Sequence, residues 1–326
     1  MTMVLKKTKL APEKEKDIIR TSEILRAGGI AALPTETVYG LAGDAANAKA
    51  VARIFAVKGR PHFNPLIAHV ATFEQAHQLA VFNNAAEKLS RQFWPGPLTL
   101  VLPYKGGEAV CELARAGLQT IALRMPSDPL THRVLKEFGS PLVAPSANRS
   151  GGVSATSALH VVDDFGDLVD IILDGGPSQH GLESTIIDVT GTPSLLRQGA
   201  IPLDEIKEAL GQNISVANSH NTQKPSSPGQ LSAHYATRTP LRLNATSLEH
   251  DEALLAFGTP LKAASYIYNL SEKSDLIEAA ANLFSHLRAL DKVGARTIAV
   301  MPVPKTGLGA AINDRLSRAA LGSKHE

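Results

Sequence analysis

Short apolar runs alternate along the chain with amphipathic stretches, and most of the runs end in small or polar residues. Residues 13–27 place apolar positions at loosely helical spacing, and a Gly-Gly pair separates them from an apolar run at 30–33. Comparable runs follow at 98–102 and 186–189. This order of elements predicts an α/β fold in which helices cover a mixed sheet.

A polar turn follows the first of these strands. Thr35, Glu36 and Thr37 bring two hydroxyls and a carboxylate together directly after Pro34. Threonines in such a place either shape the turn or face a small polar ligand, and the residues alone leave both interpretations open. The turn is therefore a candidate for one side of a binding site.

Two cations stand at the end of the next expected helix. Asn47 caps this helix, its apolar stripe continues into Lys58, and Gly59 ends it just before Arg60. A point cation beside a planar guanidinium suits a nucleotide phosphate, although most exposed Lys-x-Arg pairs are only solvated helix ends. Because Lys58 continues a buried stripe, we favour an anion site here.

Polar side chains also follow other predicted strands, at the edge where open α/β sheets bind their ligands. Arg124 ends an apolar strand and needs either an anionic partner or a route to water. Ser146 and Asn148 follow another strand and precede a Gly-rich turn whose backbone N–H groups can approach an anion. His69 shares a strand face with Ile67, so it is either a core histidine or a group that faces the site.

The composition changes between residues 211 and 240, which are rich in Ser, Asn, Gln, Gly and Pro and have little apolar periodicity. Such a profile is typical of a linker or an ordered crossing loop. It divides the chain into a first domain at 1–210, a linker at 211–240 and a small α/β domain at 241–326. In the small domain we expect strands near 254–257, 264–270 and 297–303 and helices near 275–290 and 310–321.

Composition and charge exclude several classes of protein. With 326 residues, 44% of them hydrophobic, the chain can form two domain cores and is not disordered throughout. A net charge of +2 is far below that of a dedicated nucleic-acid binder. The single cysteine, Cys111, excludes intrachain disulfides and multi-cysteine metal sites. Without a signal-peptide pattern or a membrane-spanning stretch, we expect a cytoplasmic protein with no membrane contact.

Several familiar catalytic motifs are missing from the sequence. No GxxxxGK[ST] or GxGxxG motif occurs, so a nucleotide would be held by a different arrangement. No GxSxG elbow favours a serine nucleophile, and no HExxH motif favours a metal site of the protein's own. A Mg²⁺ ion carried by ATP needs few protein ligands and remains compatible with the sequence.

Seven sequence blocks, in order, carry a resemblance to a known family. PTETVYGL, KGRP with NPL, LTLVL, LRMP, APSAN, ESTIID and LLRQGAI follow one another from Leu33 to Ile201. The chain resembles the YrdC-like family in its longer, two-domain form, because SPGQLSAHYATRTP and GLGAAINDRLSRAA resemble that form's linker and closing helix. The resemblance implies a twisted mixed sheet with helices around a central cavity, then a linker and a small Rossmann-like α/β second domain.

The resemblance also implies an activity, that of a nucleotidyltransferase. Members of this form make L-threonylcarbamoyladenylate from L-threonine, bicarbonate or CO₂, and ATP, and they release pyrophosphate. The product feeds the threonylcarbamoyladenosine modification of tRNA, which a separate transfer machinery completes, and a weak contact with RNA is compatible with the charge. Two rival interpretations are a carbamoyl-transfer enzyme, which would need a zinc finger that one cysteine cannot form, and an RNA-binding protein without chemistry.

Individual residues take expected roles from the same resemblance. Lys58 and Arg60 are the expected catalytic cations, and Thr237 departs from the proline usual at its position in the linker. Gln230 to Ala233 also depart from the usual Met and basic residues, while the linker with His234 and Tyr235 is a candidate lid. The resemblance places Lys58, Arg60, Ser146, Asn148, Ser154, Arg197 and Tyr235 around ATP and Thr35, His69, Arg124 and Ser184 around threonine.

Overall fold

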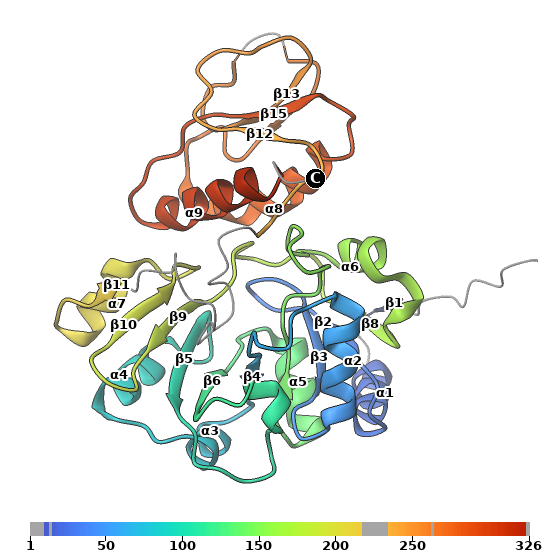
Figure 1. The fold of residues 1–326 in the computed structure, drawn as a ribbon, viewed down its shortest axis with the longest axis vertical. Helices are drawn as coiled ribbons and strands as arrows, with labels where there is room; N and C mark the ends of the chain where they lie inside the picture. Colours follow the sequence, from blue (N-terminus) through green and yellow to red (C-terminus); the bar gives the residue numbers. More distant parts are fainter. Residues whose placement is uncertain (1–9, 13–14, 217–233, 262–263, 324–326) are drawn as a thin grey trace, which may run out of the picture.

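A large and a small α/β domain make up the computed structural model of the chain (Figure 1). The structure describes residues 10–12, 15–216, 234–261 and 264–323. Most of the expected linker, with Gln230 to Ala233, lies outside the described residues. In the described part of the chain, no helix is both long and apolar enough to pass through a membrane.

One sheet organises the larger domain, and it confirms the α/β fold with a mixed sheet. Its eleven strands combine parallel pairs with antiparallel ones, as the alternation of short runs and helices predicts. Their bounds are β1 (Leu10–Pro12), β2 (Ala31–Leu33), β3 (Gly40–Asp44), β4 (Ile67–His69), β5 (Leu98–Pro103), β6 (Thr120–Arg124), β7 (Leu142–Val143), β8 (Ile171–Asp174), β9 (Thr185–Asp188), β10 (Ser194–Arg197) and β11 (Ser215–Val216).

The order of these strands brings distant parts of the sequence together. It runs β1-β8-β2-β3-β7-β4-β6-β5-β9-β10-β11. β4 and β6 are parallel neighbours, so their last residues, His69 and Arg124, lie side by side. β11 pairs with β10 beyond residue 210, so the sheet of the first domain continues past the boundary expected from composition.

Helices cover this sheet, and the polar stretch at 72–93 contributes two of them. The polar stretch at 72–93 forms separate helices because Asn83 caps a new one, accepting from the backbone N–H of Ala86. The bounds are α1 (Glu15–Arg26), α2 (Ala48–Lys58), α3 (Phe73–Leu79), α4 (Asn84–Phe93), α5 (Pro129–Phe138), α6 (Ala158–Phe165) and α7 (Leu203–Leu210), with 3-10 turns at Glu112–Arg115 and Gly166–Leu168.

Helix α2 confirms the sequence prediction at both of its ends. The side chain of Asn47 accepts hydrogen bonds from the first turn, and Gly59 ends the helix in the left-handed conformation at φ 63°. Val51, Ile54 and Lys58 are buried on the same stripe. The helix therefore directs a lysine into the protein interior.

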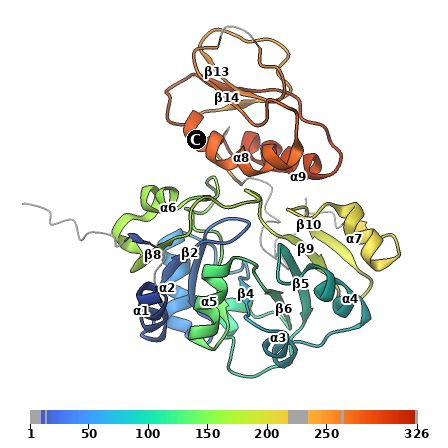
Figure 2. The same ribbon diagram turned by 180° about the vertical axis from the view of Figure 1, so that it is seen from behind.

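The small domain has a parallel sheet with two long helices against one face. β12 (Leu241–Arg242), β13 (Glu252–Ala256), β14 (Ile267–Asn269) and β15 (Thr297–Val300) lie in the order β12-β15-β13-β14. Figures 1 and 2 both show α8 (Leu276–Leu290) and α9 (Leu308–Gly322) between this sheet and the larger domain. The helices therefore form the face through which the small domain meets the large one.

Close packing and ion pairs join the two domains. Gly181 adopts φ 65°, and a Cβ there would lie 2.4 Å from the carbonyl oxygen of Ala280 in α8. Arg288 of α8 pairs with Asp164 at 2.6 Å. Leu182 of the first domain lies in one buried apolar cluster with residues of α8 and α9. The second domain is thus packed directly against the segment that leads into β9.

Candidate active site

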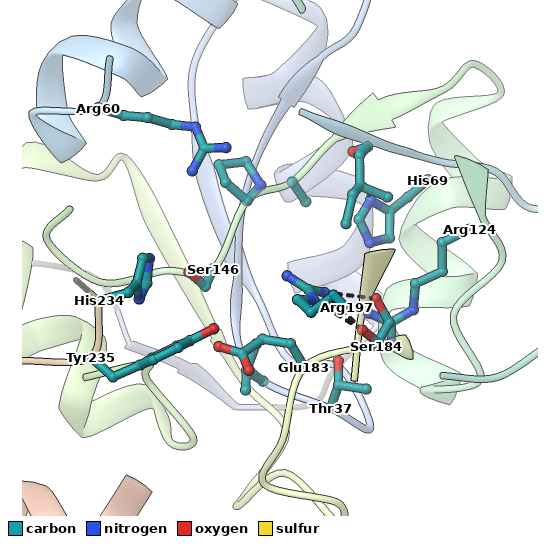
Figure 3. A pocket seen from close by; sticks show the side chains of 14 residues that line it. Thr37, Arg60, His69, Arg124, Ser146, Glu183, Ser184, Arg197, His234 and Tyr235 are labelled. Atoms are coloured by element: carbon teal, nitrogen blue, oxygen red, sulfur yellow. Dashed lines mark hydrogen bonds between the residues drawn. The ribbon is translucent and has the colours of Figure 1, made fainter. Parts of the chain in front are cut away.

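A cavity opens beside the ends of β4 and β6 and is closed on another side by the end of the linker (Figure 3). Its free volume is about 50 Å³, well below the roughly 300–1,000 Å³ typical of small-molecule pockets. Seven of the residues predicted from the sequence line it: Arg60, His69, Arg124, Ser146, Ser184, Arg197 and Tyr235. The other four, Thr35, Lys58, Asn148 and Ser154, are buried but do not line it.

Three arginines converge on the cavity. In the view of Figure 3, Arg60 and Arg124 stand on opposite sides with Arg197 between them. The Nη2 atom of Arg60 donates to the carbonyl oxygen of Pro65 at 2.9 Å, and the Nε and Nη2 atoms of Arg197 donate to that of Ser184 at 3.1 and 2.9 Å. Burial, followed by the nearby charge of Arg197, lowers the pKa of Arg60 to about 9. This concentration of buried positive charge suits an anionic ligand.

Arg124 has an anionic partner, which is one of the two alternatives that its sequence context left open. Its Nη2 atom donates to Oε1 of Glu36 at 2.6 Å, and both side chains are almost fully buried. Burial alone would raise the pKa of Glu36, but the Arg124 guanidinium outweighs it and holds that pKa below its ordinary value. Glu36 belongs to the polar turn after β2, so the turn holds Arg124 at the edge of the cavity.

His69 faces the cavity from the same strand face as Ile67, as the alternation predicts. Its Nδ1 atom lies 3.2 Å from the carbonyl oxygen of Ile67. Burial, and then the neighbouring charge of Arg124, lowers the pKa of His69 to about 3. His69 is therefore a neutral polar group at neutral pH.

The two threonines of the polar turn have different environments. The Thr35 hydroxyl donates to the carbonyl oxygen of Val38 at 2.6 Å and lies 2.8 Å from the Thr37 hydroxyl. Thr35 therefore shapes the turn, while Thr37 lines the cavity. The sequence offered both residues, but only the geometry of the turn shows which one faces the ligand space.

Lys58 reaches the cavity wall from behind. Its ammonium donates to the carbonyl oxygens of Ser146 and Asn148, both at 2.5 Å. Burial, and then the charge of Arg60, keeps the pKa of Lys58 well below its ordinary value. The Asn148 side chain closes the same turn by donating to the carbonyl oxygen of Gly152 at 2.8 Å. Together these bonds fix the turn that presents Ser146 to the cavity.

A second buried carboxylate, Glu183, lines the wall nearest the small domain. Its Oε1 atom accepts from the Ser154 hydroxyl at 2.7 Å, and its Oε2 atom accepts from Nε of Arg315 at 2.9 Å. Burial would raise the pKa of Glu183, but Arg315 and then Arg197 lower it to about 2. The carboxylate is therefore charged at neutral pH.

The end of the linker closes the cavity with two aromatic side chains. Tyr235 adopts φ 64° and stacks on Phe284 of α8, with ring centres 5.3 Å apart. His234 packs on Tyr235 with ring centres 4.1 Å apart. Nearby, Thr237 donates its hydroxyl to the carbonyl oxygen of Thr239 at 2.6 Å. Tyr235 thus joins the cavity to the second domain.

Two contributors to the site were placed only by the structure: Thr37, which the sequence offered as one of two threonines in the polar turn, and Arg315, which was not singled out from the sequence at all. Arg315 had a readable signal, because it lies beside Ile312 and Leu316 on the buried stripe of α9, as Lys58 does on α2. Within the described ranges, no three His, Cys, Asp or Glu side chains cluster as metal ligands. The two carboxylates at the site, Glu36 and Glu183, are each bound by an arginine.

Known proteins match the chain along most of its length. A family model for Sua5, YciO and YrdC proteins, described as "Telomere recombination", matches residues 23–199, and one described as the C-terminal domain of threonylcarbamoyl-AMP synthase matches residues 201–321. The threonylcarbamoyl-AMP synthase of Bacillus subtilis is 38% identical over 94% of each chain. That of Pyrococcus abyssi is 40% identical over 91% of this chain and 92% of its own.

A solved structure agrees with these matches. The crystal structure of P. abyssi Sua5 complexed with L-threonine has a TM-score of 0.88 and 36% identity to this chain, over 96% of this chain and 97% of its own. Both domains are therefore matched in one relative, in the same order. The chain belongs to the Sua5, YciO and YrdC family, and within it to the two-domain threonylcarbamoyl-AMP synthases.

Proposed function

We propose that the cavity is the place where the chain converts L-threonine, bicarbonate or CO₂, and ATP into L-threonylcarbamoyladenylate and pyrophosphate. Family membership supports the overall reaction. The observation that carries the proposed site is the convergence of Arg60, Arg124 and Arg197 on one buried cavity. Every substrate of this reaction has, or acquires, a negative group that a guanidinium can bind.

The reaction needs no protein nucleophile. The amine of threonine adds to CO₂ and loses a proton, which gives a carbamate. A carbamate oxygen then forms a bond to the α-phosphorus of ATP while the bond to pyrophosphate breaks. Such a step depends on alignment of the reactants and on cations that meet the charge of the transition state.

The threonine end of the cavity lies at β4 and β6. Arg124 is fixed by Glu36 and suits the threonine carboxylate, and His69 offers a neutral ring beside it. The Ser184 hydroxyl, 2.7 Å from that of Thr99, suits the polar atoms of the amino acid. Thr35 supports this end indirectly, because its hydroxyl shapes the turn that carries Glu36.

The ATP end lies between α2 and β10. Arg60 and Arg197 suit the phosphates, and Ser146 faces them from the turn that Lys58 and Asn148 hold. We also assign Ser154 and Tyr235 to this end, Ser154 through its bond to Glu183. We propose that Mg²⁺ enters as part of the substrate MgATP, because an ion carried by the substrate phosphates needs few protein ligands.

The closed cavity requires a movement before ATP binds. The free volume of about 50 Å³ is far below the roughly 300 Å³ at the lower end for a small-molecule pocket. We propose that His234 and Tyr235 move out to admit ATP and return to exclude water from the labile carbamate. The end of the linker would then act as a lid.

In this proposal, the adenylate product is passed on to other proteins. We propose that the threonylcarbamoyl-transfer machinery receives the adenylate in the cytoplasm and modifies tRNA. A net charge of +2 favours at most a weak contact with RNA itself.

Pyrophosphate release from purified protein tests the function. We expect release that requires ATP, threonine and bicarbonate together, with the adenylate recovered in equal amount. Pyrophosphate release that does not depend on threonine, or no release under any combination of the substrates, would contradict the proposal. Binding of a short tRNA fragment without any release would favour the rival RNA-binding interpretation.

A further inference from the structure

Helix α9 of the second domain carries a buried arginine that reaches the wall of the cavity. Arg315 is 1% exposed, and its Nε atom donates to Oε2 of Glu183 at 2.9 Å. Its Nη2 atom donates to the carbonyl oxygen of Gln198 at 2.7 Å, and its guanidinium carbon lies 5.2 Å from the centre of the Tyr235 ring. Arg315 of the second domain therefore contacts two residues that line the cavity, Glu183 and Tyr235. It also contacts Gln198, the chain neighbour of the lining residue Arg197.

These contacts determine the hydrogen-bond partners of the Glu183 carboxylate. One of its oxygens accepts from Arg315 and the other accepts from the Ser154 hydroxyl at 2.7 Å. Glu183 and Arg197 line the same cavity, yet no hydrogen bond or ion pair joins them among the contacts of the described residues. Arg197 instead donates to Ser184.

Removal of Arg315 would leave Glu183 as a buried carboxylate without its cation. A buried charge that loses its partner is strongly unfavourable, so the carboxylate would seek another cation. Arg197 is the guanidinium that shares the cavity with it. A Glu183–Arg197 pair would neutralise a positive group that the phosphates of ATP need.

We propose that Arg315 is a positioning residue of the synthase reaction, which holds Glu183 toward the second domain and so keeps Arg197 available to ATP. This inference rests on the proposed function of the cavity and goes beyond it, because it gives the second domain a part in substrate binding. The geometry that carries it is the bond from Arg315 to Glu183.

A purely structural role for Arg315 makes a different prediction. Other ion pairs join the domains without contacting Glu183, such as Lys292 with Asp163 at 2.6 Å. If Arg315 only clamps the domains together, its loss should lower stability and should not be repaired by a second change at Glu183. If it restrains Glu183, neutralising that carboxylate should restore ATP binding.

The test compares Arg315→Met, the double variant Arg315→Met with Glu183→Gln, and Lys292→Met as a matched interdomain control. The KM values for ATP and threonine are measured by pyrophosphate release, and the Tm of each protein is recorded. For Arg315→Met we expect the KM for ATP to rise about tenfold with the KM for threonine near that of the wild type. The double variant should regain most of the ATP affinity, and Lys292→Met should keep both KM values.

Two kinetic results would overturn the inference: an unchanged KM for ATP in Arg315→Met, or an equally raised KM in the double variant. If Arg315→Met gives no cooperative melt, Arg315→Lys decides the question, because lysine keeps the charge beside Glu183. We expect this variant to retain the ATP affinity, and a folded Arg315→Lys protein with a raised KM would reject the inference. The wild type separates the two proposals, since a wild type without threonine-dependent release rejects the proposed function itself.

Discussion

The ammonium nitrogen of Lys58 lies 2.5 Å from the carbonyl oxygen of Asn148, so the end of α2 is fastened to the turn that follows β7. The same nitrogen donates to the carbonyl oxygen of Ser146, whose side of the turn faces the cavity. Lys58 therefore acts on the cavity through the backbone that it holds, as well as through its charge. Arg60, two residues later, lines the cavity directly.

Replacement of Lys58 by methionine tests this arrangement. The variant loses one buried charge donor and frees the turn that carries Ser146. We expect kcat/KM for ATP to fall. The corresponding loss of transition-state stabilisation should be about 2–4 kcal/mol, the scale of one preorganised donor. The measurement is the rate of pyrophosphate release as a function of ATP concentration.

Lys49 provides the matched control for Lys58, because it lies on the same helix with an exposed side chain. Lys49→Met removes the same charge from α2 without touching the turn. We expect it to keep the wild-type kcat/KM. If Lys58→Met also keeps that value, the lysine is only a structural cation at the end of the helix.

The local pattern of the sequence predicted that Lys58 continues a buried stripe, but it could not predict the hydrogen-bond acceptors of its ammonium group. A lysine on an apolar stripe is readable because helix periodicity is local, whereas its carbonyl acceptors lie in a turn far along the chain. The same holds for Arg124, for which the sequence left an anionic partner or a route to water open and whose partner, Glu36, is 88 residues away. Pairings of this length depend on strand order, which one sequence does not specify.

Boundaries and turn geometry were also hard to read from the sequence. The composition change suggested an end at residue 210, but β11 is a short exposed strand without apolar periodicity and still joins the first sheet. Thr35 and Thr37 are the same residue type two positions apart, and only the folded turn distinguishes them. Arg315 became part of the site only when the second domain packed against the first.

Arg124→Lys is expected to weaken threonine binding selectively. A lysine cannot reproduce the guanidinium fork that binds Glu36 and that, in the proposed site, also binds the threonine carboxylate. We expect the KM for threonine to rise about tenfold, while the KM for ATP stays near the wild-type value. Initial rates with each substrate varied separately provide the measurement.

Arg91→Lys serves as the control for this substitution, because the Arg91 side chain is 79% exposed on α4. It should leave both KM values unchanged. Equal increases in both KM values for Arg124→Lys would instead indicate a general disturbance of the cavity and would contradict a specific role toward threonine.

Tyr235→Ala is expected to uncouple ATP consumption from product formation. The variant removes the ring that closes the cavity and stacks on Phe284, so water can reach the α-phosphorus in place of the carbamate. We expect less adenylate recovered per pyrophosphate released. Loss of the buried ring should also destabilise the protein by about 3–5 kcal/mol, on the scale of other aromatic-to-alanine changes.

Tyr235→Phe separates the effect of the ring from that of the hydroxyl. It retains the stacking on Phe284 and the contact with Arg315. We expect a wild-type ratio of adenylate to pyrophosphate from this variant, measured with labelled threonine. A wild-type ratio from Tyr235→Ala would reject the role of the linker end as a lid.

The buried ring of His69 should make the protein less stable as the pH falls. Burial first, and the charge of Arg124 second, lowers its pKa to about 3, below the unfolded value near 6.5. Below pH 6.5 the unfolded chain therefore binds a proton that the folded chain does not, and the loss of stability continues until about pH 3. By this linkage, His69 alone should lower the free energy of unfolding by about 2 kcal/mol between pH 7.5 and pH 5.

Denaturant unfolding of His69→Gln and of His250→Gln at the two pH values checks this contribution. His69→Gln should show a smaller loss of stability at pH 5 than the wild type, because the group that takes up the proton only on unfolding is gone. His250 is exposed, so His250→Gln should follow the wild type. Glu36 and Glu183, whose pKa values are lowered, also lose stabilising charge in acid, but they are present in all three proteins and cancel in the comparison. Equal losses in the wild type and in His69→Gln would show that His69 does not resist protonation in the folded protein.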